Sequence, residues 1–129
     1  MKRTQSKAVA LALDHVEAWS NHDYERARKG LAPDVHVIST STMEGLPRTD
    51  LRGVDEYMEG LIKFADPIKS GSLEINHSVG DDLNALLIMT VKIEGPPFGS
   101  AILQGARLYR FDENDKIKAE QVVFYVMAD

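Results

Sequence analysis

The sequence contains no cysteine. This excludes disulfides, thiolate metal sites and cysteine nucleophiles, and it gives no sign of an oxidising compartment. The chain also lacks the hydrophobic run of a signal peptide or a membrane span, because its polar start leads into helical sequence that carries Asp14, His15 and Glu17. We therefore expect a cytoplasmic protein without membrane contacts.

A cluster of basic residues is missing as well. The 15 Lys and Arg residues are scattered along the chain, and 20 Asp and Glu residues give a net charge of −5. Binding to a phosphate backbone needs clustered Lys and Arg, so nucleic acid is not an expected partner. The chain has no Gly-rich phosphate loop, nucleophile elbow or HExxH motif, and we expect neither a cofactor nor a metal ion.

The length of 129 residues and the 43% hydrophobic content fit one domain. A chain of this size buries about two-thirds of its unfolded surface, which is enough for an independent core. No repeat or linker divides the sequence. We therefore expect a single domain over residues 1–129, in which residues 1–5 form a disordered start.

Apolar residues recur at helical spacing in three segments. The first begins at Ser6 and is broken at 21–23, and the second is capped by Asp23 and ends at Pro33. The third covers 54–65 and stops at Asp66-Pro67, since proline disfavours helix in the residue before it. The apolar faces carry Val9, Ala12, Leu13, Val16 and Trp19, then Tyr24, Ala27 and Leu31, then Val54, Tyr57, Met58, Leu61 and Ala65. Three amphipathic helices are predicted.

The rest of the chain has strand character. Residues 35–39 form a first short strand, and the polar segment 40–53 that follows is predicted as a loop that serves as a pocket rim or lid. Later strands are predicted at 73–79, 85–93, 101–111 and 117–126, with turns at 80–82, 95–99 and 112–115. Strands joined by short turns pair antiparallel. The predicted fold is α+β, with the three N-terminal helices packed on one face of a curved, mainly antiparallel sheet to enclose a pocket.

Three sequence features in this order resemble the nuclear transport factor 2-like superfamily, in its SnoaL-like and ketosteroid-isomerase-like branches. They are Trp19-Ser20-Asn21-His22-Asp23, the passage 31–35 into a strand, and 107–112 followed by Lys116-Ile117. The resemblance covers about residues 6–126. It implies a cone-shaped, cystatin-like α+β roll with a deep apolar pocket and a homodimer formed through the outer sheet face. The scaffold hosts isomerases, cyclases, dehydratases and plain binding proteins, so the fold alone names no reaction.

The resemblance also implies positions for catalytic groups. Ketosteroid-isomerase-like members have a carboxylate base where this chain has Ser39, and a tyrosine and a protonated aspartate where it has His15 and Arg107. The acid/base aspartate of SnoaL-like cyclases corresponds to Tyr125. Both familiar carboxylates are therefore missing. Histidine or arginine can still donate a hydrogen bond to an oxyanion.

The two histidine candidates each have two interpretations. His15 lies at the margin of the first apolar helix face, where it could reach the pocket mouth or stay a partly exposed edge residue. His77 stands between Ile75 and Val79 on a predicted inward strand face, where it lines the pocket or is hydrogen-bonded in the core.

The later strands provide three more candidates. Arg107 shares a predicted face with Leu103, Gly105 and Tyr109, where it could bind an anionic or carbonyl-bearing ligand. Its other interpretation is an ion pair with Glu44, Asp50 or Glu120. Gln121 and Tyr125 share a predicted inward face with Ile117, Ala119 and Val123, as pocket donors or as packing residues.

The sequence thus predicts a small-molecule-binding domain with two possible roles. One is a cofactor-independent isomerase, cyclase or dehydratase for an apolar cyclic or carbonyl compound. The other is a non-catalytic ligand-binding or dimeric assembly module, with Phe98 at a hairpin tip as a further contact. The predicted catalytic residues are His15, His77, Arg107 and Tyr125, and the predicted ligand-binding residues are Trp19, Ser39, Tyr57, Met58, Leu61, Tyr109 and Gln121.

Overall fold

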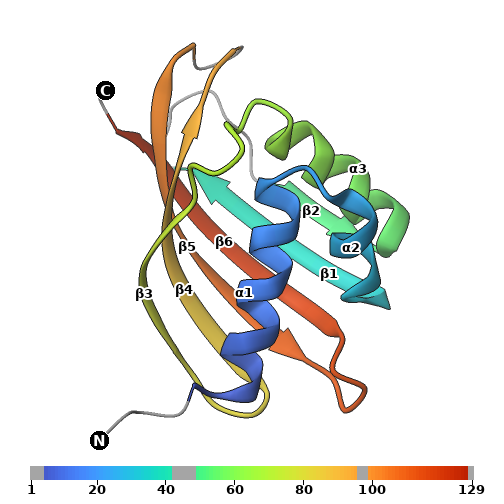
Figure 1. Ribbon diagram of the computed structural model, residues 1–129. Helices are drawn as coiled ribbons and strands as arrows, with labels where there is room; N and C mark the ends of the chain where they lie inside the picture. The colour runs from blue at the N-terminus through green and yellow to red at the C-terminus, as the bar shows by residue number, and fades with distance from the viewer. Residues whose placement is uncertain (1–4, 42–48, 96–98, 128–129) are drawn as a thin grey trace, which may run out of the picture.

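The computed structural model describes residues 5–41, 49–95 and 99–127. Its helices and strands follow in the order α1 (Lys7–Ser20), α2 (Tyr24–Lys29), β1 (Leu31–Ser41), β2 (Thr49–Arg52), α3 (Val54–Ala65), β3 (Glu74–Gly80), β4 (Asn84–Ile93), β5 (Ala101–Phe111) and β6 (Ile117–Met127). The helices gather on one face of a curved sheet (Figure 1). The predicted α+β class and its three helices are confirmed. Apart from Gln5, the predicted disordered start lies outside the described residues.

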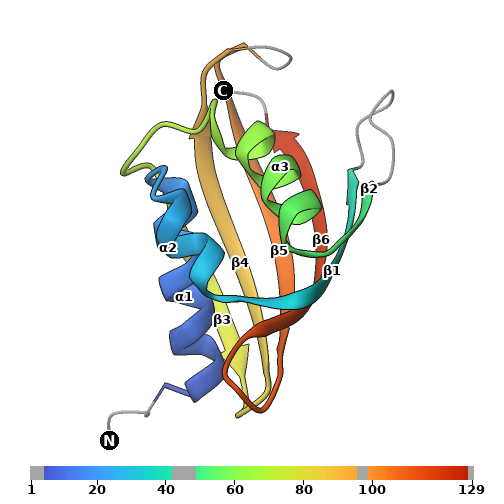
Figure 2. The same cartoon turned by 90° about the vertical axis from the view of Figure 1, so that its right-hand side faces the viewer.

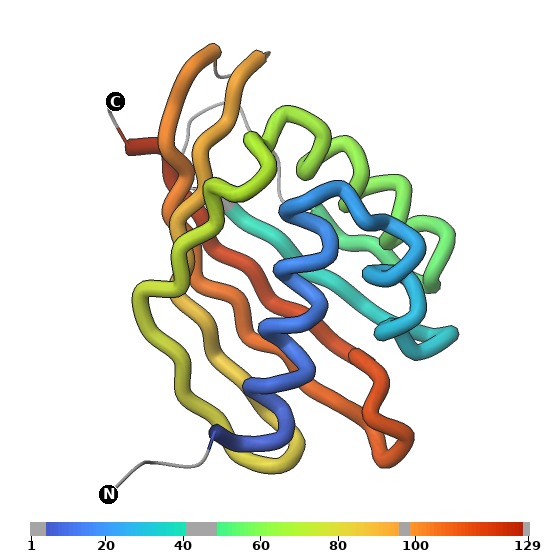
Figure 3. The backbone as a smooth tube through the Cα atoms, viewed as in Figure 1, coloured from blue at the N-terminus to red at the C-terminus, as the bar shows by residue number. Residues whose placement is uncertain are grey.

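The sheet has six strands in the order β2-β1-β6-β5-β4-β3. β3 to β6 form the predicted antiparallel meander, and β2 pairs antiparallel with β1. Only the β1–β6 pair is parallel, which is possible because α3 and the meander separate these strands along the chain. The backbone tube shows the four meander strands side by side beneath α1 (Figure 3). β6 and β5 therefore lie at the centre of the sheet, and β1 lies between β6 and the edge strand β2.

Two helices supply the apolar layer above the sheet. α1 begins at Ser6, whose hydroxyl accepts a hydrogen bond from the Val9 amide at 3.2 Å, and α3 lies over the β1–β2 side of the sheet (Figure 2). Burying one large apolar side chain contributes about 1.5–3 kcal/mol. The buried apolar residues are Ala8, Val9, Ala12, Val16, Ala18 and Trp19 in α1 and Tyr57, Met58, Leu61 and Ala65 in α3. Among the described residues, no helix is long and apolar enough to cross a membrane.

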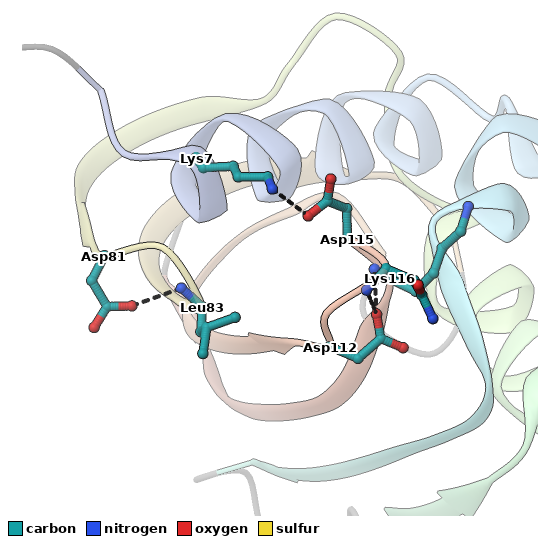
Figure 4. A network of polar contacts seen from close by, with 7 residues as sticks. Lys7, Asp81, Leu83, Asp112, Asp115 and Lys116 are labelled. Atoms are coloured by element: carbon teal, nitrogen blue, oxygen red, sulfur yellow. Dashed lines mark hydrogen bonds and ion pairs between the residues drawn. The ribbon is translucent and has the colours of Figure 1, made fainter.

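Two hairpin turns meet the start of α1 at one end of the sheet (Figure 4). The Asp81 carboxylate accepts a hydrogen bond from the Leu83 amide at 2.9 Å, and the Asp112 carboxylate accepts one from the Lys116 amide at 3.0 Å. Such side-chain bonds to the following backbone stabilise tight turns. The Lys7 ammonium lies 2.7 Å from the Asp115 carboxylate, so an ion pair joins α1 to the β5–β6 turn.

The structure corrects the predicted boundaries around β1. The second helix ends at Lys29, and Leu31–Pro33 already belongs to β1, at a register irregularity where proline is tolerated in a strand. The predicted loop at 40–53 contains the end of β1 and the strand β2, which pairs Leu51 with Val37. Residues 42–48, and with them most of the predicted rim or lid, lie outside the described residues.

The orientation of β6 also differs from the prediction. Between Ile117 and Ala119 the pairing with β5 shifts by one residue, which is the mark of a β-bulge, and the pairing with β1 is irregular at the same place. A one-residue shift exchanges the two faces of a strand. Beyond the bulge Glu120 and Val122 are therefore buried. The inward placement predicted for Gln121, Val123 and Tyr125 is wrong, because these residues are exposed.

The strand β3 lies at the edge of the sheet and is exposed along its whole length. Its pairing with β4 is irregular between Ile75 and His77, and Val79 is 63% exposed. The inward orientation predicted for His77 is wrong. Alternation of apolar and polar residues predicts a buried face only where a second layer covers that face.

Candidate functional site

A cavity of about 350 Å³ lies between α3 and the sheet. We call it the ligand cavity, and its volume falls at the lower end of the ~300–1,000 Å³ that small-molecule sites occupy. Its walls come from β1, β2, α3, β5 and β6, and most of the surface that they expose to the cavity is apolar. The lining residues are Val37, Ser39, Thr49, Leu51, Tyr57, Gly60, Leu61, Lys63, Phe64, Arg107, Glu120, Val122 and Phe124.

A buried polar cluster stands in the wall of this cavity. One carboxylate oxygen of Glu120 (Oε1) accepts a hydrogen bond from the Tyr57 hydroxyl at 2.6 Å, and the other (Oε2) lies 3.0 Å from Arg107 Nη1. Arg107 is 5% exposed and Glu120 is 3% exposed, so this is an interior ion pair. A buried ion pair persists only where good geometry and further hydrogen bonds offset the cost of desolvation. The Tyr57 hydroxyl supplies such a bond.

Two aromatic rings hold the Arg107 guanidinium. Its central carbon lies 4.7 Å from the centroid of the Trp19 ring and 4.9 Å from that of the Phe64 ring. Cation–π contacts of this kind stabilise a desolvated cation. Burial acts to lower the pKa of Arg107, but Tyr109 and Glu120 outweigh it and raise that pKa. Arg107 is therefore a fixed positive charge beside Glu120.

The tyrosines around the cluster keep their protons. Burial, and then the negative charge of Glu120, raise the pKa of Tyr57 well above its usual value, and the same two causes act on Tyr109. Tyr57 therefore donates its proton to Glu120 as a neutral phenol. Each oxygen of a carboxylate can accept two hydrogen bonds. Glu120 thus keeps acceptor capacity beyond its bonds to Tyr57 and Arg107.

His15 contacts the cluster from α1, behind the cavity wall. Its Nε2 lies 3.2 Å from the Tyr57 hydroxyl, and its ring meets the Tyr109 ring edge-on at a centroid distance of 5.6 Å. Burial lowers the pKa of His15 to about 3, and the positive charge of Arg107 acts in the same direction. His15 is 4% exposed, so the expectation of a partly exposed helix-edge residue is wrong.

The structure brings most of the predicted site residues together. Ser39, Tyr57, Leu61 and Arg107 line the ligand cavity. The remaining members lie behind it: His15 contacts Tyr57, Trp19 stacks on Arg107, Tyr109 is fully buried beside His15, and Met58 belongs to the core.

Three predicted site residues lie elsewhere. His77 is exposed on β3, Gln121 is exposed on β6, and the exposed Tyr125 donates a hydrogen bond to the Gln104 side chain. None of the three lines the ligand cavity as the structure describes it.

Glu120 was not predicted as a site residue. The sequence named it only as one of three possible ion-pair partners of Arg107. The structure confirms this ion pair, while Asp50 pairs with His36 and Glu44 lies outside the described residues. Strand alternation from Ile117 places Glu120 on the outer face, and the β-bulge turns it inward. The one signal in the sequence was the need of a buried Arg107 for a partner.

Acidic and histidine side chains in the described ranges do not gather in threes that could hold a metal ion. The cluster contributes one carboxylate, one phenol and one guanidinium. The carboxylate of Glu120 can accept a proton, and N–H and O–H donors near it can bind an oxygen atom of a ligand.

Comparisons with known proteins agree with this geometry. The model of the SnoaL-like domain matches residues 12–120. A search of the curated proteins finds no match. Many solved structures share the fold at low sequence identity, which is evidence for the fold alone. A candidate SnoaL-like polyketide cyclase from Shewanella denitrificans has a TM-score of 0.70 at 17% identity, covering 91% of this chain and 89% of its own.

Two other structures carry different descriptions. An LEH-like epoxide hydrolase from Mycobacterium tuberculosis has a TM-score of 0.68 at 16% identity, covering 92% of this chain and 82% of its own. The third is a hypothetical protein with a ketosteroid isomerase-like fold from Catenulispora acidiphila, in complex with trimethylamine. It has a TM-score of 0.67 at 13% identity, covering 87% of this chain and 82% of its own. The family model matches most of the length of the chain, and the fold agrees with this match. The chain belongs to the SnoaL-like domain family.

Proposed function

We propose that this domain binds a small, largely apolar carbonyl compound in the ligand cavity and moves a proton on it by acid–base catalysis without a nucleotide cofactor. One observation carries the proposal: a desolvated carboxylate, Glu120, stands in the wall of a cavity whose surface is mostly apolar. Active sites concentrate buried ionisable groups that have a specific charge partner.

Glu120 is the proposed proton acceptor. The salt bridge to Arg107 and the hydrogen bond from Tyr57 fix the position of its carboxylate. A general base must lie within hydrogen-bond reach of the proton that it takes. Glu120 meets this requirement through its place in the cavity wall.

The lining defines the substrate class. Val37, Leu51, Leu61 and Val122 offer apolar contacts, and the cavity volume of about 350 Å³ suits a small ring rather than a large polycycle. Ser39 lines the same cavity, so its hydroxyl is the proposed donor to a substrate oxygen. Proton removal beside a carbonyl is the step shared by isomerisation, cyclisation and dehydration of such compounds.

Deuterium exchange tests this proposal without knowledge of the natural substrate. Cyclohexanone and tetralone are incubated with the protein in heavy water, and exchange beside the carbonyl is followed by NMR. We expect Glu120→Gln to lower the exchange rate by about 10²–10⁴-fold, the usual contribution of a general base. Glu113→Gln, the same change in the exposed β5–β6 turn, is the matched control and should exchange like the wild type. Equal rates in the wild type and Glu120→Gln would reject Glu120 as the base.

Binding without catalysis is the second candidate. It is favoured by the fact that both oxygens of Glu120 already have a partner inside the protein. Under this alternative, ketones raise the melting temperature through preferential binding to the folded state, and no exchange appears after long incubation. Any exchange above the protein-free rate that Glu120→Gln removes would exclude it.

We also propose that the domain forms a homodimer through the outer face of the sheet. Large apolar side chains are exposed on the meander, and they include Val79, Leu86, Val123, Tyr125 and Met127. Extended apolar surface of this kind marks an interaction site. Sedimentation should give the mass of two chains, and Val123→Asp should give the mass of one. A monomeric wild type at high concentration would contradict the proposed dimer.

A further inference from the structure

A second cavity, of about 380 Å³, lies on the other side of His15. We call it the outer cavity. It is bounded by α1, α2 and the β5–β6 turn, and its lining includes Asp14, Arg26, Lys29, Asp115 and Lys116. Most of these side chains are exposed, so this cavity is open to water, whereas His15 forms part of its buried wall. His15 thus lies between the buried polar cluster in the wall of the ligand cavity and the outer cavity.

The hydrogen bonds of the cluster determine which nitrogen of His15 carries the proton. Tyr57 has one hydroxyl proton, and it donates this proton to Glu120. In its contact with His15 the Tyr57 oxygen must therefore be the acceptor, and His15 Nε2 the donor. His15 is neutral, because its pKa is lowered to about 3. Its Nδ1 is consequently a bare acceptor.

This bare nitrogen has no partner in the described structure. Nδ1 of His15 is buried and meets no hydrogen-bond donor among the described residues. The backbone group that acts on His15 from α2 is the Ala27 carbonyl, which is itself an acceptor. Buried polar atoms are rarely left without a partner. His15 lines the outer cavity, so water there can donate a hydrogen bond to Nδ1.

We propose that Glu120, Tyr57 and His15 form a proton relay that connects the ligand cavity with the outer cavity. The relay rests on the proposed function, because Glu120 at its inner end exchanges protons with the substrate. From the resting state, Nδ1 takes up a proton from the outer cavity, the Nε2 proton passes to the Tyr57 oxygen, and the Tyr57 proton passes to Glu120, which is then protonated. In that state Glu120 donates to the Tyr57 oxygen, Tyr57 donates to His15 Nε2, and Nδ1 carries the histidine proton toward the Ala27 carbonyl. Every hydrogen bond of the chain is then reversed.

The return to the resting state moves one net proton. The Glu120 proton passes to the Tyr57 oxygen, the Tyr57 proton passes to His15 Nε2, and the Nδ1 proton leaves into the outer cavity. Three protons shift, no heavy-atom bond changes, and Glu120 is again a carboxylate. The distances of 2.6 Å and 3.2 Å allow both transfers along existing hydrogen bonds.

The charges around His15 favour release. Burial and Arg107 oppose an imidazolium, while Asp14 and the Ala27 carbonyl act weakly in its favour. Arg26, Lys29, Asp115 and Lys116 line the exit, where each is accessible to water. A proton that reaches His15 is therefore passed on.

The tautomer of His15, read by ¹⁵N NMR at neutral pH, tests the relay without any substrate. The wild type should show the Nε2–H form. Glu120→Gln should show the Nδ1–H form, because the amide donates to Tyr57, which must then donate to His15. The signal of His15 is the one absent from His15→Gln, and Glu113→Gln should resemble the wild type.

A second pair of variants isolates the hydrogen-bond chain. Tyr57→Phe removes the link, so Glu120→Gln added to it should leave the His15 tautomer unchanged. An Nδ1–H wild type, or the same tautomer in the wild type and Glu120→Gln, would overturn the relay and leave the deuterium-exchange test of the function intact. A tautomer switch in a protein that exchanges no ketone would support the hydrogen-bond chain and reject only the proposed catalysis.

Discussion

The two cavities on either side of His15 surround their charges differently. In the ligand cavity one ion pair, Arg107–Glu120, is almost fully buried and is held by aromatic rings and a phenol. At the outer cavity exposed pairs such as Arg26–Asp14 and Lys7–Asp115 stand in water. Water and salt screen exposed charges, whereas a desolvated charge acts strongly on its neighbours. This difference supports the proposal that chemistry takes place in the ligand cavity and that the proton leaves through the outer cavity.

The largest expected effect separates the two arginines. Arg107→Gln leaves the Glu120 carboxylate buried without its cation, which should lower the free energy of unfolding by about 3–5 kcal/mol. Arg26→Gln breaks an exposed pair and should leave the unfolding free energy nearly unchanged. Urea denaturation of both variants measures the difference. Similar losses in the two variants would contradict the contrast between the cavities.

Removing both members of the buried pair sharpens the same contrast. Arg107→Met combined with Glu120→Leu takes away both charges together, so most of the stability lost in Arg107→Gln should return. Deuterium exchange should nevertheless stay at the protein-free level. A double variant that is as unstable as Arg107→Gln would mean that the ion pair, not apolar packing, is required for the fold.

The next effect is a dependence of stability on pH. The folded-state pKa of His15 is about 3, below its ordinary value of 6.5. Between these two pH values the unfolded chain binds a proton at His15 that the folded chain does not bind. The folded state should therefore lose up to about 1.4 kcal/mol per pH unit as the pH falls from about 6.5 toward 3. His15→Gln should flatten this part of the profile in urea denaturation. Parallel profiles would show that His15 protonates freely in the folded state.

The smallest effect concerns the size of the ligand cavity. A Cβ at Gly60 would stand 2.4 Å from Leu51 Cδ1, so Gly60→Ala pushes the flexible Leu51 side chain into the cavity. Alanine suits a helix better than glycine by about 0.5–1 kcal/mol, which should offset the strain and keep stability nearly constant. Binding of tetralone should weaken more than binding of cyclohexanone, as measured by calorimetry. Equal losses for both ketones would place them outside this cavity.

The adjacent strands β5 and β6 show how much of the site the sequence contains. Along β5, alternation from Leu103 through Tyr109 correctly predicts that Arg107 turns inward. Along β6 the same rule fails, because the bulge after Ile117 exchanges the faces and brings Glu120 inward. Alternation is a local property, whereas this bulge is visible only in the pairing with both neighbouring strands.

Burial of single residues depends in the same way on the layer above them. The apolar spacing of α1 and α3 predicts both helices, since the period of a helix is a property of its own sequence. The burial of His15 follows from residues far along the chain: Tyr57 of α3 and Tyr109 of β5 close around it. The exposure of His77 follows from the edge position of β3. The cytoplasmic location stays a prediction of the sequence.

The central claim is that the ligand meets Glu120 in the ligand cavity, and a crystal structure with tetralone at saturating concentration tests it most directly. The account predicts the ketone ring against Leu61 and Val122, with the carbon beside its carbonyl facing the Glu120 carboxylate. Tetralone bound in the outer cavity, or in the ligand cavity with Glu120 out of reach of that carbon, would contradict it.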